Sequence, residues 1–207
     1  LLPGITGWLG WQAALGVACA GGLALALVLL PSRAAWDEGR SPVRLSPAAV
    51  VGSLRAVWAM PALRALAMAT FCYAAMQLTL MSFTVTLLVG EVGWSLLAAG
   101  AAFAAMQATG AAARVLWGAV ADRLGRSAWV LSALGFVSAG AAILTAGLGP
   151  DSAPGWVLAV LLLFAATAIG WNGVFLAEVA RIGGPEGAGR TTGAVMVFTF
   201  SGVVIGP

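Results

Sequence analysis

The feature that most constrains this chain is a series of six long apolar segments separated by polar links. They occupy residues 7–30, 62–89, 94–118, 128–148, 155–180 and 191–207. The first five hold about 20 to 28 residues each, and the last holds 17. A helix rises about 1.5 Å per residue and a bilayer's hydrocarbon layer is roughly 30 Å thick, so the first five can cross it. The sixth would reach about 25 Å and stop short of a full crossing.

These segments do not show the strict alternation that a membrane-spanning β-strand needs. We therefore predict an all-α integral membrane protein, a helical bundle with about five complete transmembrane helices and a truncated sixth. The composition agrees, because 61% of the residues are hydrophobic and 8% are charged. A soluble domain carries about 25% charged residues. Lipid rather than water is expected to surround most of the chain.

The composition excludes several kinds of catalytic and binding site. The chain has no His, and all ten of its basic residues are Arg. A Ser-His-Asp triad, a His-ligated metal and a phosphate-binding loop with its Lys are therefore excluded. Cys19 and Cys72 lie inside apolar segments and are interpreted as packing residues. We therefore expect no catalytic residue, no metal and no cofactor. The net charge of +3 is too small to indicate a nucleic-acid partner.

The arginines indicate how the helices are oriented. If the helices alternate in direction, the links 31–61, 119–127 and 181–190 share one side of the membrane, and all ten Arg residues lie in or next to them. The opposite links, 90–94 and 149–155, contain none. The positive-inside rule then places the Arg-bearing links in the cytoplasm. The Arg-only, Ala- and Gly-rich composition suggests a bacterial protein of the cell inner membrane that crosses it several times.

One short link carries a specific motif. Gly118, Asp122, Arg123, Gly125 and Arg126 form a G-x-x-x-D-R-x-G-R pattern between two predicted helices, on the side that the arginines place in the cytoplasm. This pattern resembles the signature of the major facilitator superfamily, which joins the second and third helices of each six-helix half. The basic residue that usually follows in the first half is replaced here by Ser127, which favours the second half.

The resemblance implies that the chain covers helices 6 to 11 of a transporter. Residues 1–30 would be the last helix of the N-terminal half, 31–61 the cytoplasmic central loop, and 62–207 the C-terminal half, truncated in its fifth helix. The implied function is secondary active transport of a small solute by alternating access, with ion coupling. The expected partners are a small-molecule substrate, the lipid bilayer and the missing N-terminal half of the same chain.

Two other classes of function are alternatives for such a chain. A non-transporting membrane receptor or scaffold with a transporter-like fold is the main alternative, because a fold does not fix a function. An integral-membrane enzyme would need an acid, a nucleophile or a metal cluster deep in the membrane, and this sequence supplies none.

The motif is expected to act as a conformational latch. Gly118 and Gly125 permit a tight turn, and Asp122 would face the positive end of a neighbouring helix. Arg123 and Arg126 would pair with an acid on an adjoining helix, for which Glu178 is the best candidate. The alternative is that the arginines only mark topology and that Glu178 is a solvated charge at a helix end.

Polar residues deep in the segments are candidates for the substrate cavity, since such residues usually face the interior of a helix bundle. These candidates are Tyr73, Gln77, Gln107 and Asn172. The alternative is that each amide only bonds a neighbouring helix and holds the bundle together. Arg114 is expected to extend toward the cytoplasm, but would favour an anionic substrate if it faced the cavity.

Overall fold

The computed structural model describes residues 2–33 and 46–207, with the side chains of 2–9, 185 and 186 left out. Every regular element in these ranges is a helix, as the apolar segments predict. The described chain contains six helical stretches that are long and apolar enough to cross a membrane. Arg40 and Arg44 of the predicted central loop lie outside the described residues.

The chain divides into two units, of which residues 1–45 form the first. This unit contains α1 (Leu2–Leu29) and the short 3-10 helix η1 (Leu30–Ser32). Gly10 interrupts α1 with φ 83°, a backbone conformation that glycine adopts readily. The spanning part runs from Gly10 to Ser32, three residues later at its start than the sequence indicated.

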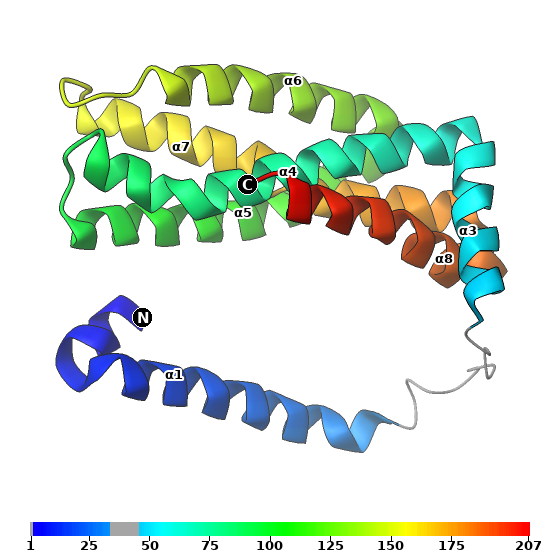
Figure 1. The fold of residues 1–207 in the computed structure, drawn as a ribbon, viewed down its shortest axis with the longest axis horizontal. Helices are drawn as coiled ribbons and strands as arrows, with labels where there is room; N and C mark the ends of the chain where they lie inside the picture. Colours follow the sequence, from blue (N-terminus) through cyan, green and yellow to red (C-terminus); the bar gives the residue numbers. More distant parts are fainter. Residues whose placement is uncertain (1, 34–45) are drawn as a thin grey trace. The chain divides into compact units, whose positions relative to one another are not determined.

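The second unit, residues 46–207, is a bundle of long helices (Figure 1). Its elements are α3 (Pro47–Ala59), α4 (Pro61–Gly90), α5 (Leu96–Leu124), α6 (Ser127–Ala146), α7 (Pro154–Ala168) and α8 (Trp171–Ile205). Proline begins three of these helices, α3, α4 and α7, a position where its missing N–H leaves no bond unmade. The links 91–95 and 147–153 lie at one end of the bundle, and α3 and the α5–α6 link lie at the other.

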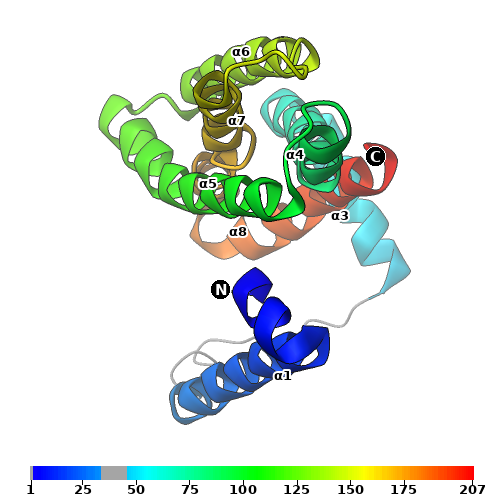
Figure 2. The same cartoon turned by 90° about the vertical axis from the view of Figure 1, so that its left-hand side faces the viewer.

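The helices pack in a defined order. Seen end-on, α7 lies between α5 and α6, and α8 runs along α4 and α5 (Figure 2). Two apolar clusters fill the interior, one around Trp171 and Phe175 and the other around Leu161 and Phe164. The α4–α8 contact is very close near the end of the chain, because a Cβ atom on Gly206 would lie 2.5 Å from the Cα atom of Ala75. Small residues at such points let membrane helices approach closely.

Two predicted links differ from the structure. The predicted link 181–190 does separate two spanning stretches, Pro154–Gly184 and Gly187–Ile205, but it is shorter than the sequence indicated. Helical geometry is lost only at Gly184 (φ 66°), so the element labelled α8 consists of two helices joined by a kink. The sixth spanning stretch therefore begins at Gly187 and holds 19 residues. The fifth stretch, Pro154–Gly184, is itself divided into α7 and the first part of α8.

The second difference is α3, which lies inside the predicted central loop. Ser46 caps this helix by accepting a hydrogen bond from the Ala49 N–H at 3.1 Å. Val57 is buried in the core, and the Trp58 ring stacks on Phe198 with ring centroids 5.6 Å apart. A Ser followed by Pro is a recognised start of a helix, so residues 46–47 carried the signal that the polarity of the segment obscured.

Candidate functional site

The candidate site is built around a break in the fifth spanning stretch. This stretch runs from Pro154 to Gly184, and Ile169 is its midpoint, fifteen residues from either end (169 − 154 = 184 − 169 = 15). The helix α7 ends at Ala168, and α8 begins at Trp171. Backbone carbonyls freed by such a break must find donors inside the protein, because lipid offers none.

Two side chains of α5 supply such donors. The indole N–H of Trp117 donates to the carbonyl of Ala166 at 2.9 Å. The Nε–H of Arg114 donates to the carbonyl of Ile169 at 3.3 Å. Arg114 was expected to extend toward the cytoplasm, but the structure directs it to the middle of the fifth stretch. The break is therefore stabilised from the neighbouring helix.

Close backbone packing places α5 against the break. A Cβ atom on Gly110 would lie 2.6 Å from Ile169 Cγ2, and one on Gly173 would overlap the carbonyl of Arg114. Gly170 also has no room for a side chain, because a Cβ there would lie 2.8 Å from the Trp117 ring. This role of Gly170 and Gly173 was missed in the sequence analysis. Their spacing of three residues on one helix face was the available signal.

Gln77 joins α4 to the same region. Its side-chain oxygen accepts a hydrogen bond from the indole N–H of Trp171 at 3.0 Å and another from the amide of Asn172 at 3.3 Å. The Asn172 amide also donates to the carbonyl of Ile169 at 3.3 Å. Two predicted cavity residues, Gln77 and Asn172, thus meet at the break. We call the connected group of Gln77, Trp171, Asn172, Ile169 and Arg114 the break network.

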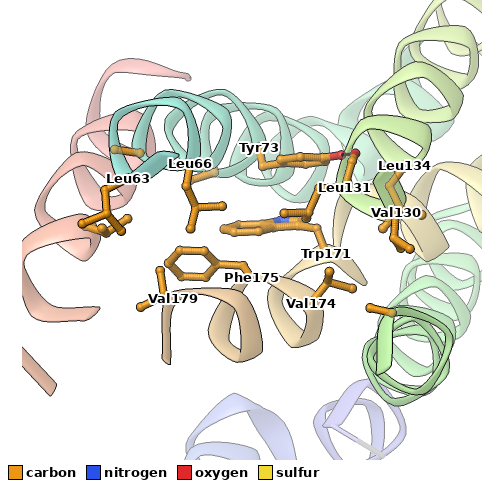
Figure 3. Close-up of a cluster of buried hydrophobic side chains, with 14 of the residues drawn as sticks. Leu63, Leu66, Tyr73, Val130, Leu131, Leu134, Trp171, Val174, Phe175 and Val179 are labelled. Carbon is orange, nitrogen blue, oxygen red and sulfur yellow. Dashed lines mark hydrogen bonds between the residues drawn. The ribbon is translucent and has the colours of Figure 1, made fainter. Parts of the chain in front are cut away.

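Tyr73 lies one helical turn from Gln77 and makes a different set of contacts. Its ring stacks on Trp171 with centroids 5.2 Å apart and planes at 18°, and Phe175 follows along the same side of α8 (Figure 3). Its hydroxyl donates to the carbonyl of Leu131 on α6 at 2.5 Å. Tyr73 therefore positions the Trp171 ring and ties α4 to α6.

An apolar cavity of about 480 Å³, lined in part by Tyr73, lies between α4, α6 and α8. Glu178 and Ile182 line it at α8, and Gly135 and Ser132 line it at α6. Neither Gln77 nor Asn172 borders it. Tyr73 lines this cavity and also stacks on Trp171 of the break network.

Gln107 does not join the break network in this structure. Its side-chain oxygen is buried and has no hydrogen-bond partner among the described residues. A buried acceptor without a donor costs about 1–3 kcal/mol. Gln107 is thus the one predicted cavity residue that the structure leaves apart from the others.

The motif residues lie where α5 meets α6. Gly125 ends α5 in the left-handed conformation (φ 61°), which explains the glycine at this position. Asp122, Arg123 and Arg126 are exposed. A Cβ atom on Gly118 would meet no atom within 4 Å, so no described residue uses the close approach that this glycine permits.

Glu178 is bound by a different arginine from those predicted. Its carboxylate accepts from Arg181 Nη2 at 2.6 Å and from Nε at 2.9 Å, across one turn of α8. The side chain of Glu178 is 11% exposed, whereas that of Arg181 is 70% exposed. Within the described residues, no ion pair joins Glu178 to Arg123 or Arg126.

Comparison with known proteins identifies the family. The sequence profile of the Major Facilitator Superfamily matches the chain over residues 1–207. No curated protein and no solved structure matches it. The family match covers the whole length and agrees with the six apolar helices of a multi-pass membrane protein. This chain belongs to the Major Facilitator Superfamily, whose members are membrane transporters of small molecules.

Proposed function

We propose that this chain forms part of a secondary active transporter that moves a small solute by alternating access, with the break network as part of the substrate-binding wall. One observation carries the proposal. Gln77 and Asn172, chosen from the sequence as cavity residues, share a hydrogen bond beside the midpoint of the fifth spanning stretch. Transporters of this architecture bind their substrates near the membrane midplane, at interrupted helices.

The arrangement of the chain in the membrane follows from the same proposal. Residues 1–30 would be the last helix of the N-terminal half, and 62–207 would belong to the C-terminal half. The links that carry arginine would face the cytoplasm of a bacterial cell, by the positive-inside rule. Transport would be ion-coupled, and the proton carrier would lie in the other half of the protein.

We also propose that the motif and Glu178 control the cytoplasmic side. Glu178 is buried, while the Arg181 that binds it is mostly exposed. In a second conformation, Glu178 would exchange Arg181 for Arg123 or Arg126. An ion pair at the membrane edge contributes about 1 kcal/mol when it is wet and more when it is desolvated, which suits a contact that must break in every transport cycle.

Uptake by the full-length protein in proteoliposomes tests the proposal. A pool of small metabolites is supplied outside, with and without a pH gradient, and the solutes that enter are identified by mass spectrometry. Gln77→Ala removes the acceptor shared by Trp171 and Asn172 and should lower uptake at least tenfold. Gln12→Ala, in the exposed face of α1, is the matched control and should leave uptake unchanged.

The outcomes separate transport from packing. If Gln77 only holds helices together, Gln77→Ala will lower thermal stability, and the protein that remains folded will transport at the wild-type rate. If no solute enters under either condition, the receptor or scaffold function replaces the proposal. Uptake that collapses without the gradient establishes the ion coupling.

A further inference from the structure

Arg114 is the most deeply placed charged residue of α5. It lies ten residues before the end of the helix at Leu124 (124 − 114 = 10), which corresponds to about 15 Å along the axis. A charged side chain at this depth costs about 2.5–3.5 kcal/mol on insertion scales and usually marks a functional site. Among the described residues, no carboxylate forms an ion pair with it. Its positive charge is therefore left without a counter-charge in this part of the protein.

Holding the Ile169 carbonyl does not require a cation. Asn172 already donates to that carbonyl, and at Ala166 the neutral indole of Trp117 alone performs the same task. Among the described residues, Arg114 is engaged only through Nε, at 3.3 Å. A guanidinium has five N–H donors, so the two terminal nitrogens, with four of them, remain available on a side chain that is exposed. The bond to Ile169 fixes the orientation of the guanidinium group and leaves its two terminal nitrogens free to bind a ligand.

The side chains around Arg114 also offer more free hydrogen-bond donors than free acceptors. The side-chain oxygen of Gln77 and the carbonyl of Ile169 each accept two hydrogen bonds already. The amide nitrogen of Gln77 has only a 3.8 Å contact to the sulfur of Met81. Apart from the oxygen of Asn172, the side chains here can therefore offer donors and a positive charge to a ligand. A carboxylate or a phosphate supplies the matching acceptors and the opposite charge.

We propose that the transported solute is a small organic anion, and that its carboxylate or phosphate binds the terminal nitrogens of Arg114 beside the break network. This inference rests on the proposed transport function and names the class of substrate. Arg114 is a binding residue in this role, and the bond from its Nε to Ile169 sets the orientation of its fork. The bidentate geometry of guanidinium favours carboxylate and phosphate over spherical anions.

The test compares solutes and variants in the full-length protein. Proteoliposomes are offered a pool of carboxylates, phosphate esters, neutral sugars and amines, and uptake is measured by mass spectrometry. We expect anions to enter. Arg114→Gln should lower their uptake by roughly 10- to 100-fold, as expected for loss of hydrogen bonds to a charged group, and Arg114→Lys should retain part of it. Arg64→Gln removes an exposed arginine near the start of α4 and should have no effect.

A second measurement uses the unaltered protein, so it does not depend on the folding of a variant. Phenylglyoxal modifies accessible arginines, and peptide mass mapping reports the rate at Arg114. Anions of the pool should slow this reaction at Arg114 but not at Arg64, and the matched neutral amides should slow neither. Uptake restricted to neutral or cationic solutes would overturn the anion inference and leave transport intact. Protection of Arg114 without uptake would support the anion site and count against transport, whereas neither uptake nor protection would overturn both.

Discussion

Gly110→Ala is the substitution whose effect follows most directly from the geometry of the break. A Cβ atom at this position would lie 2.6 Å from Cγ2 and 2.7 Å from Cβ of Ile169. Carbon atoms in contact are normally about 3.5–4.0 Å apart. Rotation of the Ile169 side chain cannot relieve the contact with its Cβ, which is fixed to the backbone. The helix α5 must therefore move away from the break by about 1 Å.

This movement has a consequence for the break network. The hydrogen bond from Arg114 to the Ile169 carbonyl is already 3.3 Å long, so a further separation of about 1 Å would abolish it. Overpacking costs about 1–3 kcal/mol, and alanine recovers about 1 kcal/mol of helix propensity relative to glycine. We expect a net loss of up to about 2 kcal/mol in the free energy of unfolding, together with weaker transport.

Gly100→Ala is the matched control on the same helix, because a Cβ atom there meets nothing within 4 Å. It should gain up to about 1 kcal/mol from propensity alone. The assay is thermal unfolding of the purified full-length protein, in which the midpoints of the two variants should differ by roughly 2–12 °C. Equal midpoints would show that α5 and the break are not in the close contact on which this reasoning depends.

Three further substitutions test other parts of the structure. Tyr73→Phe removes the hydrogen bond to Leu131 but keeps the stacking on Trp171, so we expect thermal unfolding to show a loss of about 1 kcal/mol. Ser46→Ala removes the cap of α3 and should cost about 1 kcal/mol; faster hydrogen exchange confined to the first turn of α3 would confirm it. Asp122→Asn should shift the populations of inward- and outward-facing conformers measured by spectroscopic distance probes, and unchanged populations would contradict a latch.

The spanning helices could be predicted because length and apolarity are properties of a local segment. A run of about 20 apolar residues with few charges has a single common solution in lipid. The same reasoning applies to the deep amides. Gln77 and Asn172 were singled out because polar groups are costly in hydrocarbon, and the structure brings them together through a bond of 3.3 Å. That prediction did not require any knowledge of the other contacts between the helices.

The partners of charged groups were harder to predict, because they depend on packing between distant segments. Glu178 was expected to bind Arg123 or Arg126, but Arg181 is only one turn away on the same helix. A partner at i+3 needs no folding of the chain to reach its acid. Local geometry therefore provides the contact seen in this conformation, and the exchange to the motif arginines stays a prediction.

The division of the fifth stretch into two helices could not be found from its own residues. Positions 155–180 form one continuous apolar segment in the sequence, and glycines such as Gly170 and Gly173 are tolerated in many helices. The information lies instead on α5, where Trp117 and Arg114 donate to the two carbonyls at the break. A polar side chain inside one spanning helix can thus indicate an irregularity in its neighbour, because each freed carbonyl in a membrane requires a donor. Arg114 also carries a positive charge, which a hydrogen bond to a carbonyl does not require. This charge is the reason to expect an anion beside the break.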